Sequence, residues 1–348
     1  MKQFVELPKL KSGDQVGIVS PSMGLPGLFP WVQNLGLKRM REEFGLVPKE
    51  YPTTRQMGSS LEDRARDLMA AFADSDNKAV FSSIGGADQI KLIKHLDPKV
   101  FKANPKPFFG FSDNTHVHIF LWNLGVPSYY GGGVMNQFGA NVEMYDLTKS
   151  FLKKALFDSG EFEVEVSELY NDIGLDWAVE SNLKLRRALE QNEGLFWDGS
   201  QNASGILWGG CVESIIAQVS TGKFLPTDED MDGVVLILET AEDIPPHWII
   251  EYLLTGFGER GWLNRFSGIL VGRPKAWELG KENQFTREEK LEYSQKQRET
   301  VVETVRQYNE HIPIVQNLDF GHTSPQIAMP LGRTARIDTQ QKKVFLEY

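Results

Sequence analysis

Short apolar runs alternate with amphipathic stretches through residues 1–160 of the chain. Apolar runs with the length of buried strands cover residues 15–20, 79–84, 107–111 and 126–130. Stretches with apolar side chains at helical spacing follow them, at residues 31–44, 61–72, 113–124 and 147–157. This repeated order of strand and helix predicts a parallel sheet covered on both faces, with functional residues at the carboxyl ends of its strands.

A polar stretch rich in Asn, Asp, Gly and Ser interrupts this pattern at residues 161–204. A stretch of this length without periodicity is usually a linker or a functional loop, so we expect an inter-domain connection that carries a substrate loop. Strand-like runs then return with helical segments between them, at residues 206–208, 234–238, 269–271 and 312–315. The pattern at the end of the chain predicts a hairpin with strands at residues 334–337 and 343–346.

These patterns predict an α/β protein with two domains. Residues 1–160 are expected to form an N-terminal parallel-sheet α/β domain that carries the nucleophile of any catalytic site. Residues 205–348 are expected to form a C-terminal mixed α/β domain with a small strand-rich sheet. The length of 348 residues and the 41% of hydrophobic residues agree with two globular cores.

Charge and cysteine content narrow the classes of function. The 37 Lys and Arg residues against 47 Asp and Glu residues give a formal net charge of −10, which disfavours binding to nucleic acids and anionic membranes. A single cysteine, Cys211, excludes an intramolecular disulfide framework and a cysteine-rich zinc module. The sequence opens without an apolar signal region and has no run of about 18 apolar residues, so we expect a cytoplasmic protein.

Ser112 lies where a nucleophilic serine belongs, between a short strand and a helix that Asp113 opens. The surrounding residues 110–114, GFSDN, match the G-x-S-x-G pattern incompletely, because Asn114 stands in place of the last glycine. The pentapeptide by itself leaves open that Ser112 is only a neighbour of a helix cap.

A second turn, Gly85-Gly86, also joins a strand to a helix. Its backbone N–H groups can face a ligand without an intervening Cβ, so Gly86 and the N–H of Asp113 are the expected oxyanion hole. Ala87 is a plausible substitute for Gly86, and a plain strand-to-helix turn remains the alternative.

His322 and Glu239 are the candidates for base and orienting carboxylate. His322 lies in a loop, residues 319–325, beyond the last expected core strand, whereas the other histidines lie on helices or at helix ends. Glu239 follows the most apolar strand, where a partly desolvated carboxylate needs a hydrogen-bond donor, although a helix-capping role is equally compatible.

Other candidates for chemistry are weaker. Cys211 precedes a helix and competes as a nucleophile, but a small buried core residue is the commoner role for a lone cysteine. Arg273 follows a strand and could hold a substrate carboxylate or phosphate, with an ion pair to a surface carboxylate as the alternative. The G-x-G-x-x-G and P-loop patterns are absent, which removes the main support for a nicotinamide or nucleoside triphosphate site.

The ordered set Gly85-Gly86, residues 110–114, Leu207-Trp208-Gly209-Gly210, Leu238-Glu239-Thr240 and Gly321-His322 resembles the LD-carboxypeptidase family of serine peptidases. Within it, the chain resembles the branch of the microcin C self-immunity protein. The resemblance runs from about Lys11 to the C-terminus.

The resemblance implies a Ser-Glu-His triad of Ser112, Glu239 and His322, without a metal or cofactor. It also implies a homodimer with a small-molecule substrate. Members of the self-immunity branch cut the bond between an aminoacyl or peptidyl group and a nucleotide-like moiety, and Trp177 matches the aromatic residue that stacks on the base. A domain-interface anchor is the alternative for Trp177. The alternative functions are trimming of cell-wall muropeptides and non-catalytic nucleotide binding.

Overall fold

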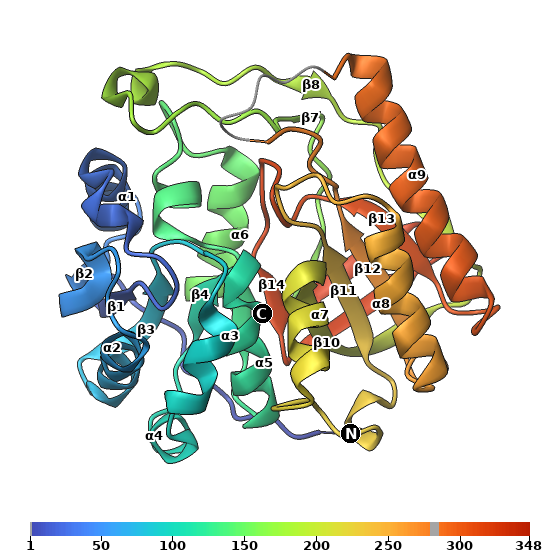
Figure 1. Cartoon of the computed structure of the whole chain (residues 1–348), viewed down its shortest axis with the longest axis horizontal. Helices are drawn as coiled ribbons and strands as arrows, with labels where there is room; N and C mark the ends of the chain where they lie inside the picture. Colours follow the sequence, from blue (N-terminus) through green and yellow to red (C-terminus); the bar gives the residue numbers. More distant parts are fainter. Residues whose placement is uncertain (1, 279–284) are drawn as a thin grey trace.

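A computed structural model describes residues 2–278 and 285–348 of the chain. Two large sheets lie next to each other with helices packed around them (Figure 1). The first sheet has six strands in the order β14-β5-β4-β3-β1-β2. Their bounds are β1 Gln15–Val19, β2 Val47–Glu50, β3 Asn77–Ser82, β4 Phe108–Gly110, β5 Ser128–Tyr130 and β14 Met329–Leu331. Strands β1 to β5 are mutually parallel, which confirms the predicted parallel sheet.

Helices cover both faces of this sheet. They are α1 Pro30–Glu42, α2 Leu61–Ala73, α3 Gln89–Leu92, α4 Pro98–Ala103, α5 Thr115–Asn123 and α6 Asp146–Phe157. Side chains of α1 and α6 share one core cluster with Phe81 of β3, while α2, α4 and α5 share another with Val80 of the same strand. Neighbouring residues of a strand point to opposite faces, so this alternation builds the two layers.

The second sheet has eight strands in the order β6-β16-β15-β10-β11-β12-β13-β9. Its parallel centre consists of β10 Ala203–Cys211, β11 Val235–Glu239, β12 Gly268–Gly272 and β13 Ile314–Leu318. The flanking antiparallel strands are β6 Glu161–Glu163, β9 Phe196–Asp198, β15 Thr334–Asp338 and β16 Lys343–Glu347. The predicted C-terminal hairpin is β15 with β16. The mixed α/β class expected from the sequence is confirmed.

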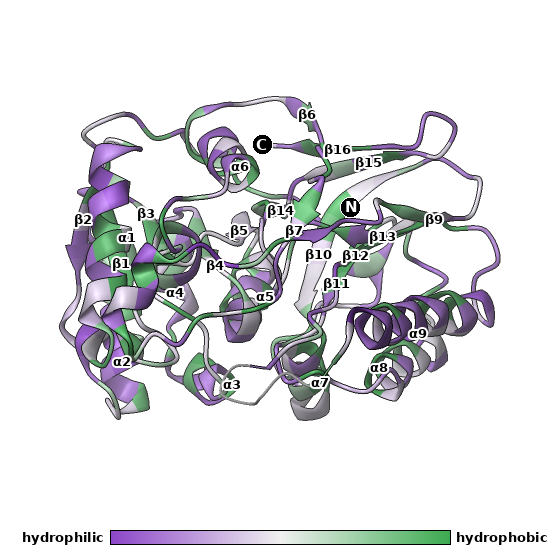
Figure 2. Ribbon diagram, turned by 90° about the horizontal axis from the view of Figure 1, so that it is seen from above, coloured by the Kyte–Doolittle hydropathy of each residue, from purple (hydrophilic) through white to green (hydrophobic). Residues whose placement is uncertain are grey.

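Three helices pack against the second sheet: α7 Val212–Thr221, α8 Trp248–Glu259 and α9 Arg287–Arg306. Helix α9 is drawn largely in purple in Figure 2, in agreement with its many charged residues. Thr286 caps it through a capping box with Glu289, as the sequence pattern indicates. Across residues 2–278 and 285–348, no helix combines the length and hydropathy that a membrane crossing requires.

The polar segment 161–204 contains more regular structure than its composition predicts. It contributes β6 and β9 to opposite edges of the second sheet and forms a small hairpin of β7 Leu169–Tyr170 and β8 Glu190–Gln191. The segment crosses the top of the molecule in Figure 1, above the carboxyl ends of the central strands. It therefore lies over the edge where we expect functional residues.

Strand β14 is the main departure from the predicted order. It comes from the C-terminal part of the chain but pairs antiparallel with β5 in the first sheet, with Met329 opposite Tyr130. One buried cluster includes Tyr130 and Phe109 of the first sheet together with Leu207 and Val235 of the second. The two sheets thus share a continuous apolar core.

Candidate active site

Ser112 stands on a tight turn at the carboxyl end of β4. A short 3-10 helix, Ser112–Asn114, follows the strand and leads directly into α5. Ser112 has a φ of 64°, which is uncommon for a residue with a side chain and is kept only where neighbours hold it. The Thr115 hydroxyl donates to the Ser112 carbonyl at 2.6 Å, and the Asn114 amide donates to the Phe111 carbonyl at 2.9 Å. These bonds fix the turn that presents the hydroxyl.

Glu239 of the second sheet is paired with His322 of the loop that follows β13. Glu239 is the last residue of β11, and its Oε2 lies 2.6 Å from Nδ1 of His322. A carboxylate accepts hydrogen bonds, so Nδ1 carries a proton and Nε2 of the neutral ring is left to act as a base. Gly321 has a φ of 100°, and a Cβ there would lie 2.6 Å from Oε2 of Glu239. Only glycine therefore allows the loop to approach the carboxylate this closely.

The environment makes His322 more basic than an ordinary histidine. Burial disfavours the charged imidazolium, but the carboxylate of Glu239 and its hydrogen bond, with a contribution from Glu242, outweigh that effect and raise the pKa of His322 above 6.5. Glu239 itself is 1% exposed. This buried carboxylate is suited to stabilise the positive charge that His322 takes on when it accepts a proton.

Ser112 and His322 line the same pocket, which has a volume of about 420 Å³. The Phe111 ring packs edge-on against the His322 ring at a centroid distance of 5.2 Å. Loops that follow strands of both sheets complete the lining together with the connecting segment, and they contribute residues such as Gly85, Gly86, Asn171, Trp177 and Lys275. The structure therefore brings the three predicted triad residues to one place, with Glu239 behind His322.

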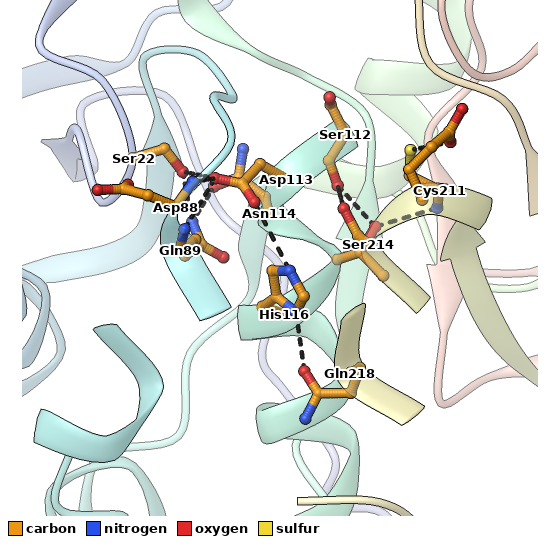
Figure 3. A network of polar contacts seen from close by, with 12 residues as sticks. Ser22, Asp88, Gln89, Ser112, Asp113, Asn114, His116, Cys211, Ser214 and Gln218 are labelled. Atoms are coloured by element: carbon orange, nitrogen blue, oxygen red, sulfur yellow. Dashed lines mark hydrogen bonds and ion pairs between the residues drawn. The ribbon is translucent and has the colours of Figure 1, made fainter. Parts of the chain in front are cut away.

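The predicted oxyanion-hole residues lie beside Ser112. A Cβ on Gly85 would lie 3.0 Å from Cβ of Ser112, so this turn is in direct contact with the serine. Gly86 and Ala87 also line the pocket. The side chain of Asp113 turns away, because its Oδ2 accepts from the Ser22 hydroxyl and from the backbone N–H groups of Asp88 and Gln89 (Figure 3). Convergence of the Gly86 and Asp113 N–H groups on a substrate oxygen stays a prediction.

The histidines of α5 have structural partners. His116 contacts the amide oxygen of Gln218 at 2.8 Å, and its other nitrogen lies 3.6 Å from Asp113 (Figure 3). His118 contacts Ser128 and the carbonyl of Gly110, and burial lowers its pKa to about 4. No group of potential metal ligands is found among the residues that the structure describes.

Cys211 is a buried core residue. It pairs in register with Glu239 across β10 and β11, and its thiol donates to Glu213 at 3.2 Å. Burial, together with the nearby carboxylates of Glu239 and Glu213, raises the pKa of the Cys211 thiol well above its ordinary value. A thiol in these surroundings stays protonated and is a poor nucleophile.

Trp177 and Arg273 have different surroundings. Trp177 lines the pocket, packs edge-on against Phe29 at 6.0 Å and accepts a hydrogen bond at its carbonyl from Trp31. Arg273 is absent from the pocket lining and forms a buried ion pair with Asp319 at 2.7 Å. This is the ion-pair alternative for Arg273, although the carboxylate is buried and not on the surface. Because Asp319 begins the loop of His322, the pair anchors that loop.

Some pocket residues carried no recognisable signal in the sequence. Lys275 forms an ion pair with Glu242 at 3.0 Å, and Arg187 reaches the pocket from the connecting segment. Tyr130, which does not line the pocket, lies beneath the turn, where the Ser112 N–H donates to its hydroxyl at 2.9 Å. Charged residues in loops and a tyrosine in an apolar strand are common, so only the folded arrangement distinguishes them.

Comparisons with known proteins match both halves of the chain. Residues 16–131 match the LD-carboxypeptidase N-terminal domain, and residues 204–337 match the LD-carboxypeptidase C-terminal domain. The microcin C7 self-immunity protein MccF of Escherichia coli is 23% identical over 290 residues, covering 82% of this chain and 78% of the relative. A probable murein peptide carboxypeptidase of Bacillus subtilis is 25% identical over 344 residues, covering 97% and 93%.

Solved structures share the whole fold. An MccF-like protein from Streptococcus pneumoniae in complex with AMP has a TM-score of 0.82 and 26% identity, covering 97% of this chain and 99% of that chain. An MccF-like protein from Bacillus anthracis has a TM-score of 0.83 and 25% identity, covering 99% of each. With both domain types matched in order, the chain belongs to the LD-carboxypeptidase family of serine peptidases.

Proposed function

We propose that the protein uses Ser112, Glu239 and His322 to hydrolyse an amide-like bond between an aminoacyl or peptidyl group and a nucleotide-like moiety. The observation that carries this proposal is the pairing of His322 with buried Glu239 at 2.6 Å, in the pocket that also holds the strained turn of Ser112. The reaction takes place in the cytoplasm on a small molecule, and the active protein is a homodimer.

The chemistry follows a two-step acyl transfer. Nε2 of His322 accepts the proton of the Ser112 hydroxyl as the oxygen attacks the substrate carbonyl, and Glu239 stabilises the imidazolium. The N–H groups of Gly86 and Asp113 stabilise the oxyanion. His322 then protonates the leaving nitrogen, which leaves an ester on Ser112. Water, deprotonated by His322, hydrolyses that ester and restores the serine.

Two observations support a nucleotide-like leaving group. An MccF-like structure at 26% identity is in complex with AMP. In the present chain, the half-buried Trp177 lines the pocket and offers an aromatic face for a base. Hydrolysis of muropeptides is the second candidate, supported by the similarity to a probable murein peptide carboxypeptidase over 97% of the chain.

Labelling with a fluorophosphonate followed by mass spectrometry tests the nucleophile. We expect a covalent adduct on Ser112 of the wild type and none on Ser112→Ala, because the alcohol attacks phosphorus as it would a carbonyl. Turnover of an aminoacyl sulfamoyl adenosine should fall by several powers of ten in the same variant. Cys211→Ser is the matched control and should be labelled like the wild type. Absence of an adduct, combined with tight nucleotide binding, would leave a non-catalytic binding protein.

A further inference from the structure

Tyr130 connects the nucleophile turn with the carboxylate of the triad. It is the last residue of β5, is 1% exposed and pairs in register with Gly110 of β4. Its hydroxyl contacts the backbone N–H of Ser112 at 2.9 Å and Oε1 of Glu239, a residue 109 positions further along the chain. A single side chain thus bridges the two sheets at the point where the catalytic groups meet.

The direction of both hydrogen bonds is fixed by the groups involved. A backbone N–H only donates, so the Tyr130 oxygen accepts from Ser112 and its own proton goes to Glu239. Burial, reinforced by the charge of Glu239, raises the pKa of Tyr130 well above its ordinary value. The phenol therefore remains a neutral donor throughout the pH range in which His322 titrates.

This arrangement occupies both oxygens of Glu239. Oε2 accepts from His322, and Oε1 accepts from Tyr130. Among the ion pairs of the described residues, His322 is the only basic partner of Glu239. The phenol thus supplies a neutral donor that disperses the charge of a fully buried carboxylate.

The hydrogen bond between Tyr130 and Ser112 also determines which backbone N–H groups are free to stabilise the oxyanion. The N–H of Ser112 is used by Tyr130, so it does not serve the oxyanion hole, and the following N–H of Asp113 is left for that role. Tyr130 also holds the Ser112 backbone, which has a φ of 64°, at its N–H group, while the Thr115 hydroxyl holds its carbonyl.

We propose that Tyr130 is a positioning residue that acts through Ser112 and Glu239: it fixes the nucleophile turn and moderates the basicity of His322. The proposal rests on the proposed hydrolase function. In Tyr130→Phe, Glu239 loses one donor and concentrates its charge on Oε2, which stabilises the imidazolium. The pKa of His322 therefore rises, and the unanchored serine reacts more slowly.

The experiment measures the rate of fluorophosphonate labelling of Ser112 as a function of pH. In Tyr130→Phe, we expect the plateau rate to fall about tenfold, the size of effect that loss of one ordinary hydrogen bond produces, because the Ser112 turn is no longer anchored. We also expect the acidic limb of the pH profile to move to higher pH, because Glu239 has lost its phenol donor. Tyr129→Phe is the matched control, because Tyr129 is a buried neighbour whose hydroxyl contacts Lys9. It should lower stability without moving the limb.

Site-specific replacement of Tyr130 by 3-fluorotyrosine covers the case in which the phenylalanine variant does not fold. The fluorinated phenol has nearly the same shape and is a stronger donor, so the limb should move to lower pH. An acidic limb that coincides with the wild type in the folded variants would overturn the proposal. Failure of the wild type itself to be labelled would instead contradict the proposed hydrolase function, so the two failures are distinguishable.

Discussion

Burial and the carboxylate partner have opposite effects on the pKa of His322. Burial favours the neutral ring, and Glu239 favours the imidazolium and prevails, so the pKa is raised above 6.5. The base is active only when neutral. A raised pKa therefore makes His322 a stronger base. It also places the onset of activity at a higher pH than a histidine with an ordinary pKa would.

We expect kcat/KM to rise with pH through a single acidic limb whose midpoint lies above 6.5. Stability changes in the opposite direction: a histidine with a raised folded-state pKa contributes stabilisation that is fully present below the unfolded pKa and lost as pH rises through the folded value. A pH profile of activity, with thermal unfolding of His322→Gln as the reference, measures both trends. A midpoint below 6.5 would show that burial prevails over Glu239.

At the scale of single residues, sequence reasoning can propose candidates whose position follows from a local pattern. Ser112 and Glu239 each follow an apolar strand, and His322 lies in a loop between a strand and a proline. Tyr130 was not predicted as a site residue, because the role proposed for it depends on Glu239, which lies 109 positions away in another sheet. For Arg273, the position after a strand left both a ligand contact and an ion pair open. In the structure, its guanidinium forms an ion pair with the buried carboxylate of Asp319.

Elements that depend on distant partners are the ones that local patterns miss. The central strands of both sheets are apolar runs that any partner would bury, and they were predictable within a few residues. Strand β14, by contrast, is a three-residue stretch with a central proline, and β6 and β9 lie within polar sequence. Each of these strands forms because a neighbouring strand has a free edge with which it can pair. The periodicity of the sequence gives no information on such distant pairing.

The segment 161–204 is the element that should set substrate preference, through Trp177. If Trp177 stacks on a base, Trp177→Ala should raise the activation free energy for cleavage of an aminoacyl sulfamoyl adenosine by about 1 to 3 kcal/mol. The rate of cleavage of an L,D-tetrapeptide should stay unchanged. If Trp177 only anchors the segment through Phe29, Trp177→Ala should lower the rates of cleavage of both substrates equally. Kinetics with the two substrates side by side separate these outcomes.

Trp248→Ala provides the matched control for this comparison. Trp248 is an exposed tryptophan of α8 outside the pocket lining, so its removal should change neither rate. Faster cleavage of the tetrapeptide by the wild type, unaltered in Trp177→Ala, would overturn the nucleotide preference. Cell-wall peptide trimming would then be the better assignment.

At the scale of the whole molecule, the proposed catalytic groups come from two sheets that share one apolar core. Ser112 follows a strand of the first sheet, whereas Glu239 ends strand β11 of the second. His322 lies in the loop that leads from β13 of the second sheet to β14 of the first. Strand β14 returns from the C-terminal part to pair with β5, and one apolar cluster spans both sheets. The predicted boundaries at 160 and 205 thus divide the sequence more sharply than the packing does.

We therefore expect the full chain to unfold in one cooperative transition, with activity lost at the same denaturant concentration as the tryptophan fluorescence signal. A fragment of residues 1–160 lacks β14, so β5 becomes an unprotected edge and Tyr129 and Tyr130 lose the residues that cover them. It should aggregate or remain unfolded. Equilibrium unfolding monitored by fluorescence and activity, together with circular dichroism of the fragment, tests this. Two resolved transitions, or a folded and soluble fragment, would show that the sheets are independent domains and that the shared core contributes little to their stability.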